Sequence, residues 1–458
     1  MRITEATIFC LRIPFVEAFK HSASARACSD SIVVRVTAED GTVGYGEGVA
    51  RPYVTGETVE SVVSGVADNL WPAVASADFA PLVAGHDEIS TLASISEALP
   101  NPPADGPVAA HGAHSAVELA LIDCLLRSQK LSLGEILPPK RAAVIYSGVI
   151  TAGSIDAAVR HARYFRILGI NHLKIKIDRD NPVERVAAIR RAVGAEVSLR
   201  VDANGAYDPA TAKRVLSALS EFGVVSAEQP IPRGDPAELA QLNAGSPIPI
   251  MADESVVTLA DARTLIAARG CQYFNLRLSK CGGIVRTLRL ARLASDAGLR
   301  LQLGCHVGET AILSAAGRHV AAHLEAVEFV EGSYGKLLLA EDVARDSIVF
   351  GHGGAAPLLR GPGLGIKVRE EVLRRYAQRI IALSSTTRPS SLRKGGPENV
   401  SVNQKRHPRT RTTRESPSGS ISNRSGNCPA TFSVWAAGKE RGNKFRTKAR
   451  LCLHSHRG

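Results

Sequence analysis

Short hydrophobic runs recur through the middle of the chain, and helix-like stretches separate them. The runs read AVIYSGVI, HLKIKI, VSLRVDAN, VVSAEQPI, IPIMADES, YFNLRLSK, RLQLGCHV and AVEFVEG. Amphipathic stretches such as SIDAAVRHARYFRILG and PVERVAAIRRAVG lie between them. Apolar strands that alternate with helices predict a parallel sheet covered by helices. Eight such strands favour a closed TIM-type α/β barrel over the alternative, a doubly wound open sheet.

The segments on either side of this region have a different pattern. SIVVRVTAEDGTVGYGEG predicts a hairpin around an Asp-Gly turn, and helical patterns follow in GETVESVVSGVADNLWPAVA and AHSAVELALIDCLLRSQ. We expect an α+β domain over residues 1–130 and the barrel over 142–335. No clear helix pattern follows the eighth strand, and residues 336–383 are expected to pack back on the first domain.

The end of the chain shows no periodic pattern of apolar residues. Residues 384–458 are rich in Ser, Thr, Arg and Pro, which predicts a disordered basic tail. This tail holds 16 of the 56 basic and 3 of the 44 acidic residues, so 40 basic and 41 acidic residues precede it. The net charge of +12 therefore belongs to the tail. A nucleic-acid-binding arm and a non-native extension both explain the tail, but nucleic acid is not an expected partner of the nearly neutral folded part.

The cysteines and the N-terminus indicate the cellular compartment of the protein. The eight cysteines are scattered, without a CxxC pair or a repeated Cys/His spacing, which is typical of a reduced protein rather than of a disulfide framework or a zinc site. MRITEATIFCLRIPF shows no secretory signal, and no apolar run approaches the roughly 18 residues of a membrane span. We expect a cytoplasmic protein that does not span a membrane.

Ionisable residues end five successive predicted strands. They stand 26, 26, 25 and 27 positions apart, at Lys176, Asp202, Glu228, Asp253 and Lys280. Two further steps of similar length lead to His306, beside Cys305, and to Glu331. One βα unit per step would bring these side chains to the C-terminal mouth of the barrel, where such folds build their active sites.

The three carboxylates predict a metal site. Asp202, Glu228 and Asp253 would repel one another at the mouth, and a hard divalent cation would neutralise them. Ligation by oxygen alone favours Mg²⁺ or Mn²⁺ over zinc. The alternative is that each carboxylate caps the helix that follows its strand.

The lysines indicate proton transfer. Lys174 and Lys176 share one face of a strand because they are two residues apart. A neighbouring ammonium and a bound metal both lower the pKa of a lysine, so Lys174 would help to keep Lys176 neutral and able to accept a proton. A phosphate or carboxylate clamp is the alternative, and it suits Lys174 better. Lys280 would lie across the mouth from Lys176, with the metal between the two lysines. Two opposed lysines at a metal indicate abstraction of a proton next to a carboxylate, through an enediolate.

These motifs resemble the enolase superfamily, specifically its muconate-lactonizing (muconate cycloisomerase) subgroup. The matching stretches are LKIKI, RVDANGAY, AEQPI, MADES and LSKCGGI, with GYGEG before them and GPGLGIKV after them. The resemblance covers about residues 1–376. It implies a modified TIM barrel, (β/α)7β, with an N-terminal α+β capping domain, and sites of this superfamily combine a lysine or histidine base with Mg²⁺.

The resemblance also implies roles for residues. The expected metal ligands are Asp202, Glu228 and Asp253; the expected acid/base groups are Lys176 and Lys280, with Lys174 as their helper; the expected supporting residues are Asn204 and Glu254. Relatives of the mandelate racemase type pair a seventh-strand His with a sixth-strand Asp. The sixth strand here ends in Lys280, so His306 is expected to line the pocket.

Candidate substrate contacts lie in two loops and on the last strand. The loops FKHSASAR and RPYVTGE offer Lys20, His21, Arg26 and Tyr53, each of which could equally be a solvated loop residue. Glu331 on the eighth strand is a further candidate.

Relatives with this lysine pair catalyse several reactions. The stretch EFVEGSYGKLLLAED lacks the D-x-D that resembles the amino-group clamp of a dipeptide epimerase, and GKLLLAED is similar to muconate cycloisomerases. We therefore predict a muconate cycloisomerase-like isomerase of a small carboxylate, expected to form a homo-oligomer as many relatives do. The alternatives are a racemase or epimerase of N-acylated amino acids or dipeptides and a dehydratase of the o-succinylbenzoate synthase type. A catalytically inactive binding protein should lack a base or a metal ligand, and none is missing.

Overall fold

The computed structural model describes most of the chain before the predicted tail. It covers residues 1–21, 24–85, 87–101, 110–151 and 153–385, and side chains at 17–25 are not described. The predicted disordered tail, apart from Ser384 and Ser385, lies outside the described residues.

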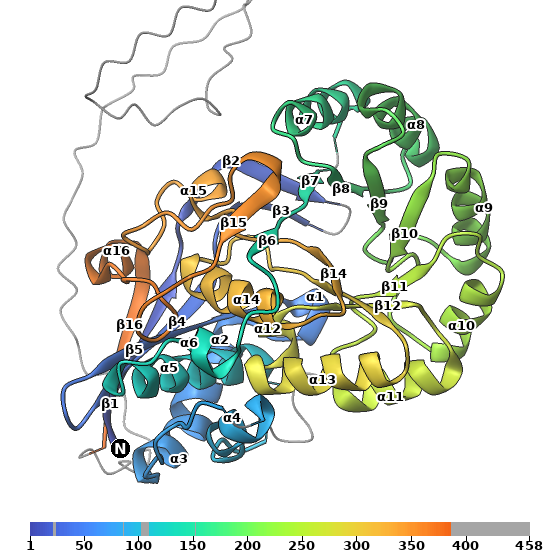
Figure 1. Cartoon of the computed structure of the whole chain (residues 1–458). Coiled ribbons are helices and arrows are strands. Elements are labelled where there is room, and N and C mark those ends of the chain that lie inside the picture. Colours follow the sequence, from blue (N-terminus) through green and yellow to red (C-terminus); the bar gives the residue numbers. More distant parts are fainter. Residues whose placement is uncertain (22–23, 86, 102–109, 152, 386–458) are drawn as a thin grey trace, which may run out of the picture. The chain divides into compact units, whose positions relative to one another are not determined.

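Eight parallel strands form one curled sheet whose spatial order follows the chain (Figure 1). They are β7 (Gly148–Ile150), β8 (His172–Lys176), β9 (Ser198–Asp202), β10 (Val224–Glu228), β11 (Ile250–Ala252), β12 (Tyr273–Leu276), β13 (Arg300–Leu303) and β14 (Val327–Val330). Tyr146, just before β7, forms a parallel bridge with Val330 of β14. The two edges of the sheet therefore meet, which confirms the predicted barrel over an open sheet.

Helices connect successive strands and cover the outside of the barrel. They are α7 (Ile155–Ile167), α8 (Pro182–Val193), α9 (Pro209–Ser220), α10 (Pro236–Ala244), α11 (Leu259–Ala268), α13 (Ile284–Asp296) and α14 (Ala311–His323). Two further helices are single turns, α12 (Leu278–Cys281) before α13 and α15 (Gly335–Leu338) after β14. The seven longer helices and eight strands give the predicted (β/α)7β form.

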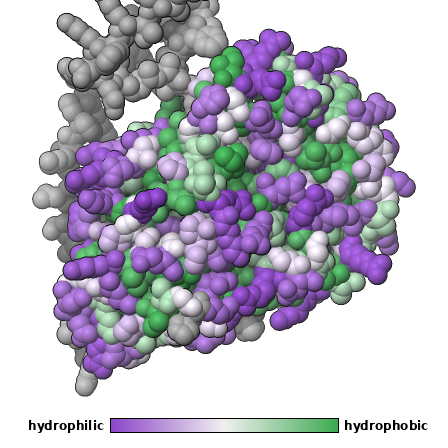
Figure 2. Space-filling view, in the orientation of Figure 1, coloured by the Kyte–Doolittle hydropathy of each residue, from purple (hydrophilic) through white to green (hydrophobic). Residues whose placement is uncertain are grey.

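Local sequence sets where these helices begin. Proline occupies the first turn of α8, α9 and α10, where its missing N–H costs nothing. The side chains of Asp208 and Asp235 accept hydrogen bonds from backbone amides in the first turns of α9 and α10. The helices bury their apolar side and expose polar residues, and Figure 2 shows hydrophilic side chains along much of the rim of the face in view.

A second sheet contains strands from both ends of the described chain. Its order is β16 (Ala377–Ser384), β1 (Ile3–Leu11), β4 (Ser31–Ala38) and β5 (Val43–Val49), and the pairings are antiparallel. Beside it lie the hairpin β2 (Pro14–His21) with β3 (Ser24–Cys28) and the helical elements α1 (Pro52–Thr55), α2 (Val59–Ser64), η1 (Gly65–Leu70), α3 (Trp71–Ser76), α4 (Glu88–Glu97), α5 (His111–Ser128) and α6 (Leu133–Ile136). This is an N-terminal α+β domain, as predicted, and β16 returns to it after the barrel.

The segment after the barrel adds small elements. A two-stranded ribbon joins β6 (Ala143–Ile145) to β15 (Ala355–Pro357), and η2 (His352–Gly354) and α16 (Glu370–Tyr376) flank that return. The exact domain limits proposed from the sequence stay a prediction.

Three alternating glycines explain how α5 packs on β5. Gly44, Gly46 and Gly48 face this helix, and an added Cβ at each would overlap the backbone of α5. The pattern GYGEG therefore lets a helix lie directly on a strand, where any side chain would hold the two apart. Nearly all of α5 is buried.

No described helix combines the length and the apolar character needed to cross a membrane.

Candidate active site

The candidate site lies at the C-terminal ends of the barrel strands. Lys176, Asp202 and Glu228 are the last residues of β8, β9 and β10, and Asp253 directly follows β11. The strand register pairs Asp202 with both Lys176 and Glu228. Asp202, Glu228 and Asp253 are 0%, 2% and 0% exposed. Three buried acids therefore come from adjacent strands at one edge of the barrel, where the sequence placed them.

Lys280 was predicted to end the sixth barrel strand, but the structure places it beyond the end of that strand. It is not at the end of β12 but in the one-turn helix α12, four residues beyond that strand. Gly282 and Gly283 follow at φ +87° and +107°, a conformation that suits glycine and permits this tight turn. The Nζ of Lys280 still reaches the site, because it donates to Asp253 Oδ1 at 2.9 Å and to Asp253 O at 2.7 Å.

Lys174 binds several carboxylates at once. Its Nζ lies 2.9 Å from Asp202 Oδ2, 2.7 Å from Glu228 Oε2 and 3.1 Å from Glu331 Oε2. Although burial opposes this, the three negative charges raise the pKa of Lys174 well above its ordinary value. Lys174 is therefore a fixed positive charge at the centre of the site.

Lys176 lies beside Lys174 with a different set of partners. Its Nζ donates to Asp202 Oδ2 at 2.5 Å and to Asn204 Oδ1 at 2.8 Å. Asn204 in turn donates from Nδ2 to Glu254 Oε1 at 3.1 Å. The structure thus brings the two predicted supporting residues, Asn204 and Glu254, into one chain of hydrogen bonds with Lys176.

Sequence reasoning missed three polar residues that hold the carboxylates. Arg277 makes a short ion pair with Asp253 and lies 3.6 Å from Glu228 Oε1. Asn275 Nδ2 donates to Glu228 Oε1 at 2.9 Å, and Gln302 Nε2 donates to Glu228 Oε2 at 2.8 Å. The sequence signal that could have revealed them is a polar residue inside an otherwise apolar run, as in YFNLRLSK and RLQLG.

The carboxylates perturb one another strongly. Burial and the charges of Asp202 and Asp253 raise the pKa of Glu228 to about 8. Burial and the charge of Asp253 raise the pKa of Glu254 to about 7. Burial acts in the same direction on Asp202, but the charges of Lys174 and Lys176 overcome it and hold the pKa of Asp202 below its ordinary value. The cluster is therefore an environment that favours added positive charge.

The donor set fits a hard divalent cation, because Mg²⁺ prefers carboxylate oxygens. As the side chains stand, no three His, Cys, Asp or Glu residues in the described part of the chain are arranged to hold an ion. Lys174 bridges Asp202 and Glu228, and Arg277 bridges Glu228 and Asp253. Metal binding would therefore require some of these ion pairs to rearrange.

His306 and Glu331 have contrasting surroundings. His306 is 2% exposed and neither ring nitrogen has a described partner. Burial and the charges of Arg277 and Arg51 hold its pKa well below the ordinary value, so its imidazole is neutral. Glu331 is paired through Oε2 with Lys174 and through Oε1 with Arg200, both at 3.1 Å. Arg200 was also missed from the sequence.

The proposed substrate loops are described in part. Arg26 and Arg51 both pair with Asp30, and the Arg51 contact is 2.6 Å. Tyr53, in α1, is 40% exposed. The side chains of Lys20 and His21 lie outside the described part of the chain.

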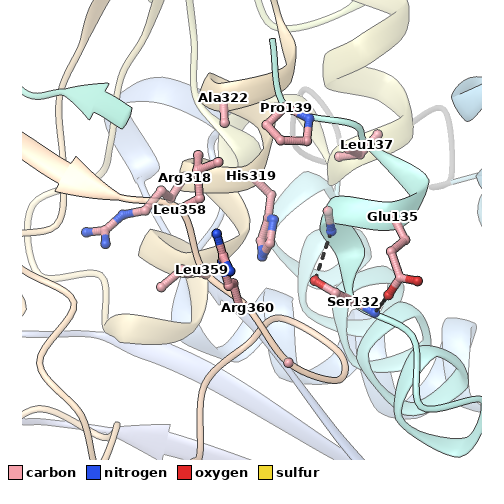
Figure 3. A pocket seen from close by; sticks show the side chains of 12 residues that line it. Ser132, Glu135, Leu137, Pro139, Arg318, His319, Ala322, Leu358, Leu359 and Arg360 are labelled. Carbon is pink, nitrogen blue, oxygen red and sulfur yellow. Dashed lines mark hydrogen bonds between the residues drawn. The ribbon is translucent and has the colours of Figure 1, made fainter. Parts of the chain in front are cut away.

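A separate cavity shares no residue with this site (Figure 3). It has a volume of about 350 Å³ and lies between α6, the C-terminal half of α14 and residues 358–361. Figure 3 shows His319 beside Arg360, and Glu135 close to the amide of Ser132, to which it is hydrogen-bonded.

The chain matches two family models in sequence. The model described as "Mandelate racemase / muconate lactonizing enzyme, N-terminal domain" matches residues 3–137, and the model described as "Enolase C-terminal domain-like" matches residues 157–372. A hydrophobic dipeptide epimerase from Citrifermentans bemidjiense is 30% identical over 380 residues, covering 80% of this chain and 98% of that protein. Muconate cycloisomerase 1 from Rhodococcus opacus is 29% identical over 392 residues, covering 82% and 97%.

Comparison with solved structures finds relatives of the same kinds. The crystal structure of N-succinyl Arg/Lys racemase from Bacillus cereus superposes with a TM-score of 0.75 at 25% identity, covering 84% of this chain and all of that one. A dipeptide epimerase from Cytophaga hutchinsonii, complexed with Mg and the dipeptide D-Ala-L-Val, superposes with a TM-score of 0.72 at 25% identity over 83% of this chain and all of that one. Both predicted reaction types, cycloisomerisation and racemisation or epimerisation, are thus represented among the relatives. The chain is a member of the enolase superfamily, an enzyme of the mandelate racemase/muconate lactonizing enzyme family.

Proposed function

We propose that the protein racemises or epimerises an N-acylated amino acid by removing and returning the proton next to its carboxylate. The observation that carries the proposal is the presence of two lysines at one carboxylate cluster, Lys176 on β8 and Lys280 after β12. Inversion of a carbon centre needs an acid/base group on each side of the carbon, whereas a reaction on one face needs one.

Each lysine has a defined part in this proposal. Lys176 accepts the proton from one enantiomer while Lys280 donates a proton to the opposite face, and the roles reverse for the other enantiomer. Lys174, fixed between Asp202, Glu228 and Glu331, contributes positive charge where the substrate carboxylate binds. The neutral His306 lines the pocket and takes no part in the proton transfer.

A divalent cation, Mg²⁺ or Mn²⁺, completes the proposed site. Asp202, Glu228 and Asp253 would hold it, with Asn275 and Gln302 orienting Glu228 through the hydrogen bonds described above. When bound, such a cation stabilises the negative charge that develops on the substrate carboxylate after proton loss.

Glu331 supports N-acylated amino acids over dipeptides with a free amino group. An ammonium on the substrate would need an unpaired carboxylate as its partner. Glu331 is the one acidic residue between Val330 and Glu341 in the sequence, and Lys174 and Arg200 already neutralise it. An acyl-capped nitrogen carries no charge and needs no such partner.

A muconate cycloisomerase-like reaction is the second candidate. The 2-chloromuconate cycloisomerase of Rhodococcus opacus superposes on this chain with a TM-score of 0.74 at 28% identity, over 83% of this chain and all of that one. That reaction would use one lysine and leave the other as a charge in the pocket. A dehydratase of the o-succinylbenzoate synthase type would use the same cluster.

The test is solvent exchange in D₂O. Wild-type protein with Mg²⁺ is incubated with N-succinyl and N-acetyl amino acids of each hand and with cis,cis-muconate. Deuterium at Cα together with appearance of the opposite enantiomer supports the proposal. A lactone from muconate, without exchange in any amino-acid derivative, would establish the second candidate instead.

We also propose that the enzyme works in the cytoplasm as a homo-oligomer on a small carboxylate. The six described cysteines are free thiols, as a reducing compartment would maintain them. Nucleic acid is not part of the proposal, because the excess basic residues belong to the tail. Truncation after Ser385 should therefore leave turnover unchanged.

A further inference from the structure

Three side chains on one face of α5 contact the turn that carries Lys280. They are His111, His114 and Glu118, whose spacing of three and four residues aligns them along the helix. All three are buried, at 4%, 1% and 0% exposure. The proposed chemistry uses none of them, and they belong to the N-terminal domain rather than to the barrel.

Each side chain binds the backbone of the turn at a different residue. His111 Nδ1 donates to the carbonyl oxygen of Lys280 itself at 2.5 Å, and His114 Nδ1 donates to that of Gly282 at 2.9 Å. Glu118 Oε2 accepts from the amide of Ile284, the first residue of α13, at 2.5 Å. Burial lowers the pKa of His111 to about 4 and that of His114 to about 3, so both rings are neutral and Nδ1 carries the proton.

The last residue of β5 holds the other side of the turn. The amide of Val49 donates to Ser279 Oγ at 2.8 Å, and that hydroxyl lies 3.4 Å from the carbonyl oxygen of Val49. Ser279 directly precedes Lys280. The N-terminal domain therefore binds the backbone at Lys280, Gly282 and Ile284 and the side-chain hydroxyl of Ser279.

The turn fits these contacts closely. Gly283 adopts φ +107°, and an added Cβ there would overlap the carboxylate of Glu118. An added Cβ at Gly282 would lie 3.1 Å from the His111 ring. The sequence SKCGGI thus lets α5 approach the backbone directly, as the glycines of β5 let α5 approach the sheet.

We propose that His111 is a positioning residue for Lys280, and that His114, Glu118 and Ser279 fix the same turn from the N-terminal domain. The inference rests on the proposed function, because it assigns Lys280 to one face of the substrate carbon. Lys176 lies on β8 and its ammonium bonds to Asp202 and Asn204, so the α5 contacts bear on one base and not on the other.

The test compares exchange of the two enantiomers in D₂O with full-length protein and Mg²⁺, using N-succinyl-L-arginine and N-succinyl-D-arginine or the pair that wild-type protein exchanges fastest. Lys280→Ala first identifies the enantiomer whose proton Lys280 removes. His111→Leu should then slow exchange of that enantiomer by about 10- to 100-fold, as a misplaced catalytic group does. Exchange of the other enantiomer should stay within about two-fold of wild type.

Two further variants separate positioning from general damage. His111→Asn should restore most of the lost rate, because its Nδ2 can donate from nearly the place of Nδ1. His319→Leu is the matched control: His319 is also a buried histidine that donates to a backbone carbonyl, that of Leu364 at 3.3 Å, and its loss should leave the ratio of the two exchange rates unchanged. Ser279→Ala gives the same selective loss should His111→Leu fail to fold.

The outcomes distinguish the two proposals. A selective loss in His111→Leu or Ser279→Ala supports positioning. Equal slowing of both enantiomers, or no slowing, overturns positioning and leaves the proposed function intact. Wild-type protein that exchanges neither enantiomer of any acylated amino acid overturns both.

Discussion

The two lysines proposed as acid/base groups are held in different ways. Lys176 ends a barrel strand, its side chain is 10% exposed, and its Nζ has two hydrogen-bond acceptors, Asp202 and Asn204. Lys280 lies in a one-turn helix, its side chain is 0% exposed, and its Nζ has three acceptors, which are two oxygens of Asp253 and the carbonyl of Asn275 at 2.6 Å. The backbone of Lys280 is also bound by His111 of α5.

This difference shows how the two domains share one site. The barrel sheet alone fixes Lys176, because strand register places it beside Asp202. Lys280 sits on a turn whose glycines could adopt other conformations, and contacts from α5 and β5 select one of them. If Lys280 acts as proposed, the N-terminal domain therefore helps to position one of the two acid/base groups.

Removing the divalent cation should have the largest effect, since both lysines would depend on it. Dialysis against a chelator should lower exchange of both enantiomers by at least about 100-fold, and added Mg²⁺ or Mn²⁺ should restore both. The readout is deuterium incorporation followed by NMR. Loss of only one enantiomer's exchange would contradict a shared cation.

Replacing either lysine should slow the exchange of one enantiomer and not of the other. Lys176→Ala and Lys280→Ala should each lower exchange of one enantiomer by about 10²- to 10⁴-fold, and the affected enantiomer should differ between the two variants. Magnesium binding, measured by calorimetry, should persist in both. If both variants lose the same enantiomer, the lysines do not act on opposite faces.

A methyl group added between β5 and α5 should displace α5 and so disturb the position of Lys280. Gly46→Ala places a Cβ against the backbone of Ala116 and Ala120 and should destabilise the protein by about 1–3 kcal/mol. Urea unfolding measures this, and exchange of the Lys280-dependent enantiomer should fall more than that of the other. Gly245→Ala is the control: it lies at φ −103° at the end of α10 with no neighbour closer than 3.8 Å, and it should change stability by less than about 0.5 kcal/mol.

Acidification should weaken the contact of His114 with the turn that carries Lys280. The pKa of His114 falls from an ordinary value of about 6.5 to about 3 in the fold, so its stabilising contribution is complete above pH 6.5 and declines as the pH falls toward 3. At pH 5 the loss amounts to about 2 kcal/mol. His114→Asn cannot titrate, so its stability relative to wild type should improve between pH 7 and 5.

Glu118 acts in the opposite direction within this pH range. Burial raises its pKa to about 7, so its contribution is complete below about pH 4.5 and declines as the pH rises toward 7. Glu118 is present in both proteins, and the difference between wild type and His114→Asn therefore isolates His114. A difference that does not vary with pH would contradict a neutral buried His114.

The sequence predicted the barrel and the placement of the acids because both have regular local signals. Apolar strands recur at a nearly constant spacing, and Asp202, Glu228 and Asp253 each stand at or directly after a strand end. Asn275 and Gln302 were missed because they lie within strands that otherwise look like core, and Arg277 was missed because it directly follows one of these strands in the same apolar run. The contact of His111 with Lys280 joins residues 169 positions apart and leaves no periodic trace in the sequence.

The most direct test of the account is a crystal structure with Mg²⁺ and an N-succinyl amino acid bound. We expect one ion held by Asp202, Glu228 and Asp253, with the substrate Cα between the Nζ atoms of Lys176 and Lys280. A structure in which the three acids point apart, or in which both lysines lie on the same side of Cα, would contradict it.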